Sequence, residues 1–251
     1  MSSTEFEHLK KAPIISAIAQ IRVNYGIEFK DFPIESLARR LQKVYPKVNR
    51  NWSGDIEILE SEVGKDQVSL QNKRLNGVKF YNEEGEEVFS VFNDLINLEI
   101  RSDYKKFEDF IDTFLPKVDM ILELVPTAVF QSSSLRYINK IDVNEEVKRT
   151  EDYFKVYLTS TDDFPVGISE YNFSYVSRLS DQNMFYRLIH AMAPVRINGE
   201  YSFLLDIDVH KKIDSANDPK LLRQTFDDLR NLKNQVFFSV LTERTLKLLK
   251  G

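Results

Sequence analysis

The chain has 251 residues, of which 42% are hydrophobic and 12% aromatic, so it can bury a core in one large domain or two small ones. It contains no cysteine, which excludes a disulfide framework, a thiolate metal site and a cysteine nucleophile, and which is typical of a reducing cytosol. The formal net charge of -5 argues against a globally basic nucleic-acid-binding protein. The polar N-terminus lacks the apolar core of a signal peptide, and no stretch approaches a membrane span of about 20 apolar residues, so we expect a cytoplasmic protein without a membrane partner.

The first elements in chain order are a strand and a helix. In PIISAIAQIRVNY, residues 13–25, apolar residues recur at every second position, which predicts a strand covered on one side. The next segment, DFPIESLARRLQKVYP at 31–46, has apolar residues at helical spacing and ends at a proline. We therefore expect a helix there, with Leu37 and Val44 on its buried side.

Several strands and a long helix complete the first half of the chain. Strands are predicted at 55–63, 67–71 and 97–102, and a hairpin at 77–92. The hairpin turns at the Glu-Glu-Gly sequence of 83–85. A long helix is predicted at about 104–125, because apolar side chains recur there every three or four residues. Pro116 lies inside this helix and is expected to kink or divide it.

The second half has a related order of elements. Strands are predicted at 129–143 and 202–210, and a hairpin at 171–193 that turns at 180–183. A weak helix is predicted over EEVKRTEDYFKVYL, residues 145–158. The clearest helix signal lies at 218–241, where Asp218 is a suitable N-cap and Pro219 a suitable first helical residue. Its apolar stripe includes either Leu232 or Lys233.

This order predicts an α+β protein with curved, mostly antiparallel sheets packed on long helices. Because strand, helix, strands and helix follow one another twice, we expect two related lobes, 1–126 and 127–251. No linker rich in glycine, proline or serine separates them, so the lobes should pack closely or form a single domain. A sheet curved around a helix can leave a concave surface or a groove for a ligand.

Three ionisable residues share one face of the strand predicted at 202–210. Asp206, Asp208 and His210 alternate there with apolar residues, and carboxylates at this spacing lie about 7 Å apart. Two carboxylates and an imidazole can hold Mn²⁺, Mg²⁺ or Zn²⁺, but a single strand rarely supplies a complete site. Acids on the less buried face of a sheet commonly pair with cations on a neighbouring strand. We therefore expect a structural charge network here, with a binding role and a metal or catalytic role as alternatives.

The segment LRYINKIDV, residues 135–143, offers the cations for such a network. Its alternation places Arg136 and Lys140 on one face and Asn139 on the other. A row of cations can also hold a phosphate or carboxylate ligand. The candidate binding residues, with no catalytic residue and no metal ligand assigned, are Arg136, Asn139, Lys140, Asp206, Asp208 and His210.

A second candidate surface is a basic stretch that ends near Trp52. Its residues are Arg39, Arg40, Lys43, Lys47 and Arg50. Basic residues beside an aromatic residue are typical of nucleic-acid contacts. A solvated helix face explains them equally well, and the acidity of the chain argues against nucleic acid as a partner.

The sequence contains none of the short motifs that identify a reaction. There is no HExxH, no GxSxG and no Walker-type loop, and the chain has only 8 glycines, without a phosphate-cradling cluster. The histidines, His8, His190 and His210, are scattered along the chain. His190 lies on an apolar face and is expected to be a partnered interior residue rather than a general base.

Three stretches of the chain are similar to those of an uncharacterised family of sporadically distributed bacterial proteins of similar length. They are LKKAPIISAIAQIRV, LRYINKI, and FLLDIDV followed by a long helix that ends in FFSVLTE. The residues that carry the resemblance are Pro13, Arg136, Asn139, Asp206 and Asp208. The resemblance implies a bacterial cytosolic protein from a mobile or antiviral-defence locus, and it brings no reaction, cofactor or catalytic residue.

These observations favour a non-enzymatic binding or interaction protein without a cofactor. It would recognise a partner protein, a second copy of itself or a small ligand through a concave sheet or the groove between the lobes. One alternative is a metal-dependent phosphoesterase with Asp206, Asp208 and His210 as ligands and Arg136 or Lys140 on the phosphate. The other alternative is nucleic-acid binding through the basic stretch.

Overall fold

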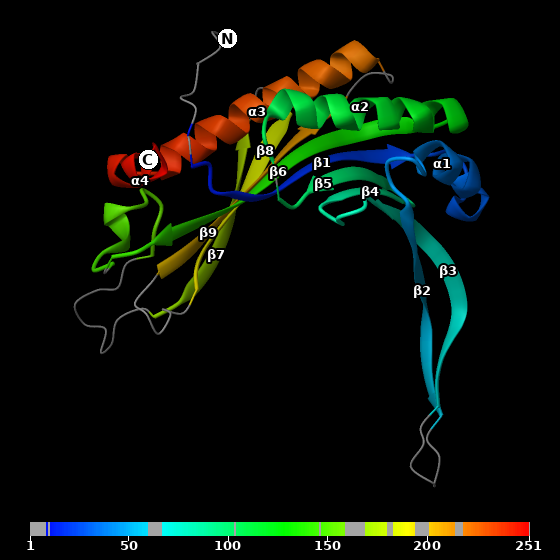
Figure 1. Ribbon diagram of the computed structural model, residues 1–251, viewed down its shortest axis with the longest axis horizontal. Coiled ribbons are helices and arrows are strands. Elements are labelled where there is room, and N and C mark those ends of the chain that lie inside the picture. The colour runs from blue at the N-terminus through cyan, green and yellow to red at the C-terminus, as the bar shows by residue number, and fades with distance from the viewer. Residues whose placement is uncertain are drawn as a thin grey trace.

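The structure is a computed structural model that describes residues 9, 11–59, 67–102, 104–145, 147–158, 169–179, 183–193, 201–213 and 218–250. A nine-stranded sheet runs through this described part and is bent into an arch, with helices along its outer side (Figure 1). The strands are β1 (Ile14–Asn24), β2 (Lys47–Leu59), β3 (Gln67–Tyr81), β4 (Glu87–Phe92), β5 (Leu95–Ile100), β6 (Val129–Val143), β7 (Tyr171–Leu179), β8 (Met184–Met192) and β9 (Tyr201–Lys212). The helices are α1 (Ile34–Leu41), α2 (Phe107–Leu124), α3 (Pro219–Val240) and α4 (Glu243–Lys250).

Strands from the two halves of the chain meet in the middle of the sheet. The order is β2-β3-β4-β5-β1-β6-β9-β8-β7, and every neighbouring pair is antiparallel. β1 pairs with β6, where Ala19 lies opposite Leu135, and each of the two is flanked by a later strand of its own half. The α+β class is therefore confirmed, with both halves contributing to one sheet, while the division into two related lobes stays a prediction.

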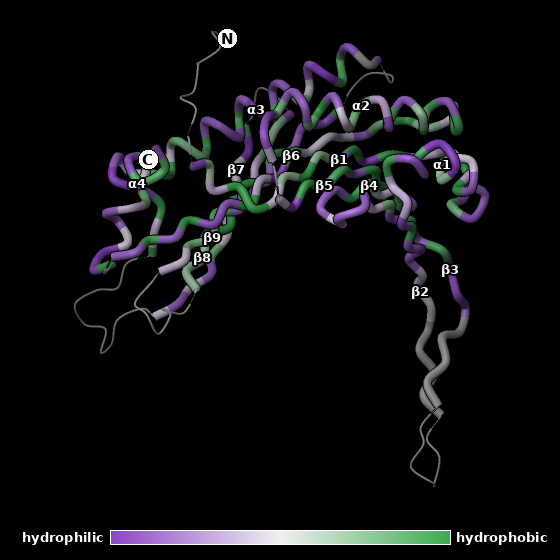
Figure 2. The backbone as a smooth tube through the Cα atoms, in the orientation of Figure 1, coloured by the Kyte–Doolittle hydropathy of each residue, from purple (hydrophilic) through white to green (hydrophobic). Residues whose placement is uncertain are grey.

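The apolar alternation of the strands decides which face of the sheet the helices cover. Ala19, Leu135 and Ile207 are fully buried on the covered face. Phe114 of α2 and Phe226 of α3 are also 0% exposed, and their rings meet edge to face at 5.7 Å between centroids. Figure 2 shows hydrophobic residues gathered along the central strands beneath these helices. The opposite, concave face has no helix in the part of the chain that the structure describes (Figure 1).

The first helix lies inside the predicted segment 31–46 and buries Leu37 as predicted, but it ends earlier. α1 ends at Leu41, and the chain then turns so that the carbonyl oxygen of Leu41 accepts the backbone N–H groups of Val44 and Tyr45. This turn exposes 58% of Val44 and buries Tyr45 completely. The prediction that Val44 belongs to the buried stripe is therefore wrong.

The strand predicted at 55–63 is the second part of a longer strand. β2 begins at Lys47 and pairs with β3, from Lys47 opposite Tyr81 to Leu59 opposite Gln67. It forms one edge of the sheet, where 54% of Trp52 is exposed. Three parts of the predictions lie outside the described residues: His8, residues 60–63, and residues 180–182 of the hairpin turn.

Helices α2 and α3 lie in the two segments with the clearest helical periodicity. α2 is one continuous helix that contains Pro116, so the proline does not divide it. α3 begins as its sequence predicts: the side chain of Asp218 accepts the backbone N–H of Lys220, and Pro219 is the first helical residue.

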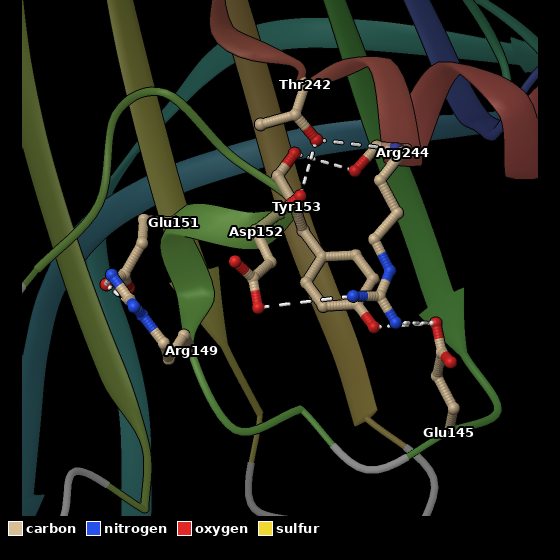
Figure 3. A network of polar contacts seen from close by, with 8 residues as sticks. Glu145, Arg149, Glu151, Asp152, Tyr153, Thr242 and Arg244 are labelled. Atoms are coloured by element: carbon tan, nitrogen blue, oxygen red, sulfur yellow. Dashed lines mark hydrogen bonds and ion pairs between the residues drawn. The ribbon is translucent and has the colours of Figure 1, made fainter.

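The helix predicted at 145–158 is wrong. Among the described residues of this range, only the 3₁₀ turn Thr150–Asp152 forms, because the segment is tied to the start of α4 instead. Figure 3 shows that network: the Tyr153 hydroxyl donates to Glu145 at 2.7 Å, and Arg244 of α4 binds the same carboxylate. The Thr242 hydroxyl donates to the backbone of Asp152. These long-range contacts outweigh a weak local preference, and α4 itself was not predicted.

Candidate ligand-binding site

The acids singled out in the sequence lie on the concave face, and Asp206 is fully engaged. Asp206 is only 3% exposed, and its carboxylate accepts two hydrogen bonds from Arg136, at 2.9 Å from Nε and 2.6 Å from Nη2. The two residues are diagonal neighbours, since Asp206 lies opposite Ile138 and Arg136 lies opposite Asp208. This bidentate ion pair confirms the predicted cross-strand pairing of these two residues.

Asp208 and His210 form a second contact on the same face. His210 Nε2 lies 2.9 Å from Asp208 Oδ2, and the His210 ring stacks on Phe185 with centroids 4.4 Å apart. Arg178 in turn lies over the Phe185 ring, so these side chains form a ladder across β9, β8 and β7. The other carboxylate oxygen of Asp208 is buried and has no hydrogen-bond partner among the described residues.

The six candidate binding residues do not converge on one site. Lys140 pairs with Asp142 at 2.9 Å on the concave side. Asn139 lies on the helix-covered face, 2% exposed, and donates to the backbone carbonyls of Tyr137 and Leu205. Within the described ranges, no group of three or more acidic or histidine side chains is arranged to hold a metal ion.

The basic stretch is divided between α1 and β2 and is mostly neutralised. Arg40 pairs with Glu123 and Arg50 with Glu35, while Lys47 lies 3.9 Å from Glu83. The remaining members are Arg39, which donates to a backbone carbonyl of α1, and the exposed Lys43. Acidic partners weaken the attraction that this surface could exert on a phosphate backbone.

His190 is the partnered interior residue that its position predicts. It is 1% exposed, with Nδ1 at 3.1 Å from the carbonyl oxygen of Val156 and Nε2 at 3.3 Å from the Tyr171 hydroxyl. Burial lowers the pKa of His190 to about 4, although the hydrogen bond to Val156 opposes the shift. The ring is therefore neutral in the folded protein at physiological pH.

His190 makes the stability of the protein depend on pH. Between its folded pKa of about 4 and its ordinary value of 6.5, the unfolded chain binds more protons, so the free energy of unfolding must fall as the pH falls. Between pH 7 and pH 5 the loss from this one group is about 2 kcal/mol. Urea unfolding at pH 7 and pH 5 measures this fall in the free energy of unfolding. The fall should be about 2 kcal/mol smaller in His190→Gln than in the parent protein. Equal losses in the two proteins would contradict this assignment.

A pocket on the helix-covered side lies where the two halves of the chain meet. It holds about 410 Å³ and is enclosed by the stretch before β1, the start of α2, β6 and α3. We call it the junction pocket; its lining residues are Leu9, Ala12, Pro13, Ile14, Tyr104, Lys105, Lys106, Phe107, Glu108, Tyr137, Asn139, Arg230, Lys233, Asn234, Phe237 and Phe238. Nine of these sixteen residues are apolar or aromatic and seven are charged or amide residues, so the lining suits a ligand with an apolar part and a charged part.

Lys233 is the unusual member of this lining. It belongs to α3, and its Nζ lies 4.2 Å from the centre of the Tyr137 ring. The amine makes no hydrogen bond or ion pair with any other described residue. Burial, assisted by the nearby charge of Arg230, lowers the pKa of Lys233 to about 7. Lys233 is half-buried, and an amine partly removed from water without an acidic partner is costly for folding, which makes it a candidate for a functional group.

The groups around Lys233 are held in fixed positions. The hydroxyls of Tyr104 and Tyr137 are 2.7 Å apart, and their rings meet at 90°. Burial raises the pKa of Tyr104 to about 12 and that of Tyr137 well above its ordinary value, so both hydroxyls stay protonated. Arg230 is held at 2.5 Å by Glu108 and lies over the Phe107 ring. The pocket thus offers cationic and hydroxyl donors against an apolar wall.

A larger cavity of about 610 Å³ lies near the ends of β7, β8 and β9. The charged residues of its described lining are Lys140 and Glu170, and Lys140 is already paired with Asp142. We therefore consider the junction pocket the better site. Of the two cavities, it is the one whose described lining contains a cationic group, Lys233, without an acidic partner.

Sequence reasoning missed the junction pocket, although one signal pointed to it. Lys233 occupies a position of the apolar stripe of α3, four residues after Leu229 and four before Phe237. A lysine in the buried stripe of a helix is a conflict between pattern and chemistry, and such conflicts are expected at functional sites.

Comparison with known proteins does not identify the chain. No protein-family model matches it, and the search of curated proteins found no match. None of the helices in the described ranges is both long and apolar enough to cross a membrane. The case for a function therefore depends on the site itself.

Proposed function

We propose that this is a non-enzymatic binding protein whose junction pocket takes a small amphipathic anion. The phosphate or carboxylate group of the ligand would lie at Lys233 and Arg230, and its apolar body would pack against Phe107, Phe237 and Phe238. The observation that carries the proposal is the Lys233 amine, which has no acidic partner in the described structure.

The charge of the lining supports an anion rather than a neutral ligand. Among the described lining residues, Lys105, Lys106, Arg230 and Lys233 are basic, and only Glu108 is acidic. This local excess of positive charge occurs in a chain whose net charge is -5. Charged groups are worth more in a partly dehydrated pocket than at the surface, so the anionic group should supply most of the specificity.

Other parts of the sequence-based prediction stay predictions. A partner protein or a second copy on the concave sheet, and a place in a bacterial defence locus, are compatible with the structure and independent of the pocket. The phosphoesterase alternative is less favoured, because Arg136 occupies the Asp206 carboxylate that it would need. Nucleic-acid binding is less favoured because acidic side chains pair with Arg40 and Arg50.

Titration calorimetry with simple probes tests the proposed function. Octanoate and phenyl phosphate should bind to the full chain, and benzyl alcohol, which is uncharged, should bind much more weakly. Lys233→Met keeps most of the stem of the side chain and removes its charge, so it should weaken binding of both anions at least about tenfold, or about 1.4 kcal/mol.

Lys220→Met is the matched control for this experiment. Lys220 lies in the first turn of the same helix, is exposed, and is absent from the pocket lining. Its replacement should leave the affinity unchanged. The proposal fails if neither anion binds, if benzyl alcohol binds as tightly as they do, or if the two lysine variants behave alike.

A further inference from the structure

We propose that binding of an anion in the junction pocket is coupled to the uptake of one proton by the amine of Lys233. This inference rests on the proposed function and adds to it a rule for how the affinity of the site depends on pH. It arises from the placement of Lys233 beside the positive charge of Arg230 and without an acidic partner among the described residues.

The described surroundings of Lys233 offer an ammonium ion no acidic partner. Arg230 precedes it by about one helical turn on the same face of α3 and repels a second positive charge. The only acidic group of the described lining, Glu108, is already bound to Arg230 at 2.5 Å. The Tyr137 ring favours a cation at 4.2 Å, while burial and the charge of Arg230 lower the pKa of Lys233 to about 7.

The other charged or titratable groups of the described lining are accounted for element by element. The start of α2 contributes Glu108 and, at the exposed mouth, Lys105 and Lys106. The tyrosine hydroxyls hydrogen-bond each other and stay protonated. The lining residues before and at the start of β1, which are Leu9, Ala12, Pro13 and Ile14, carry no titratable side chain. We therefore assign to Lys233 any proton that is taken up near neutral pH.

A bound anion reverses the balance at Lys233. A negative group near the amine favours its charged form and raises its pKa toward the ordinary value of 10.5. Above pH 7 the free amine is mostly neutral, so binding must draw a proton from solution. Below pH 7 the amine is already charged, and binding draws none. By linkage, the affinity should fall up to about tenfold for each pH unit above 7.

Calorimetry of octanoate binding in buffers of different ionisation enthalpy counts the protons directly. Octanoate is ionised at both pH 6 and pH 8, so it contributes no proton of its own. The dependence of the observed heat on buffer enthalpy should correspond to nearly one proton taken up at pH 8 and nearly none at pH 6. Lys233→Arg keeps a permanent charge, so it should bind octanoate at pH 8 with no proton uptake. If Lys233→Met still binds some octanoate, that binding should also take up no proton.

The outcomes separate this inference from the proposed function. Binding at pH 8 with no proton uptake would overturn the inference and leave the proposed function intact. Uptake that persists in Lys233→Arg would also overturn it, because another group would then carry the proton. Failure of octanoate to bind at either pH, with phenyl phosphate also inactive, would overturn both.

Discussion

Arg136→Ala should destabilise the protein by about 3–5 kcal/mol, because it leaves the Asp206 carboxylate buried without its counter-charge. Arg136 supplies two hydrogen bonds to a residue that is 3% exposed, and no other described side chain contacts that carboxylate. The lost stability would come from the Asp206 carboxylate, which remains buried without a partner. It would not come from lost burial of Arg136, because the Arg136 side chain is 37% exposed. Urea unfolding at pH 7 measures it.

A double variant separates this explanation from a simple loss of packing. Arg136→Met with Asp206→Leu removes both charges and keeps apolar bulk in the sheet. Because replacing a buried ion pair by apolar residues is often neutral or stabilising, the double variant should recover most of the lost stability. A loss below about 1 kcal/mol in Arg136→Ala, or no recovery in the double variant, would contradict the structural role of the pair.

Phe226→Ala should cost about 3–5 kcal/mol, the usual range for removing a fully buried aromatic side chain. Phe226 is 0% exposed and packs edge to face on Phe114, so it holds α3 against α2 above the sheet. The partly exposed Leu221 lies on the same helix, 42% exposed, and provides the control. Leu221→Ala should change stability by no more than about 0.5 kcal/mol. Similar losses in the two variants would mean that α3 is not held through this contact.

The elements that could be predicted from the sequence are those whose signals are local. The alternation in β1 and β6 and the Asp218-Pro219 start of α3 depend only on neighbouring residues, and the structure has all three. The Arg136–Asp206 pair was predictable for a related reason, since opposite charges on adjoining strands of one face tend to meet.

The elements that could not be predicted depend on contacts between distant parts of the chain. Residues 145–158 carry a weak helical signal, but Tyr153 and Phe154 are buried against residues near 241–245 and hold the segment in another shape. The order of the strands, with β1 beside β6, is likewise fixed by long-range pairing.

The candidate site shows the same limit. The sequence directed attention to acids on a strand, whose charges the fold satisfies with nearby cations. The functional candidate is instead a lysine whose acidic partner is missing from the described structure, and this property appears only once α3 has been placed over Tyr137. Burial of a charge is a tertiary property, so spacing alone does not reveal it.

The most direct measurement is a crystal structure of the full chain with bound 4-bromophenyl phosphate, located by the anomalous scattering of bromine. We expect a bromine peak against Phe107, Phe237 and Phe238, with the phosphate within hydrogen-bonding distance of the Lys233 amine. A bromine peak on the concave face beside Asp206 and His210, or a junction pocket without ligand while the compound binds elsewhere, would contradict it.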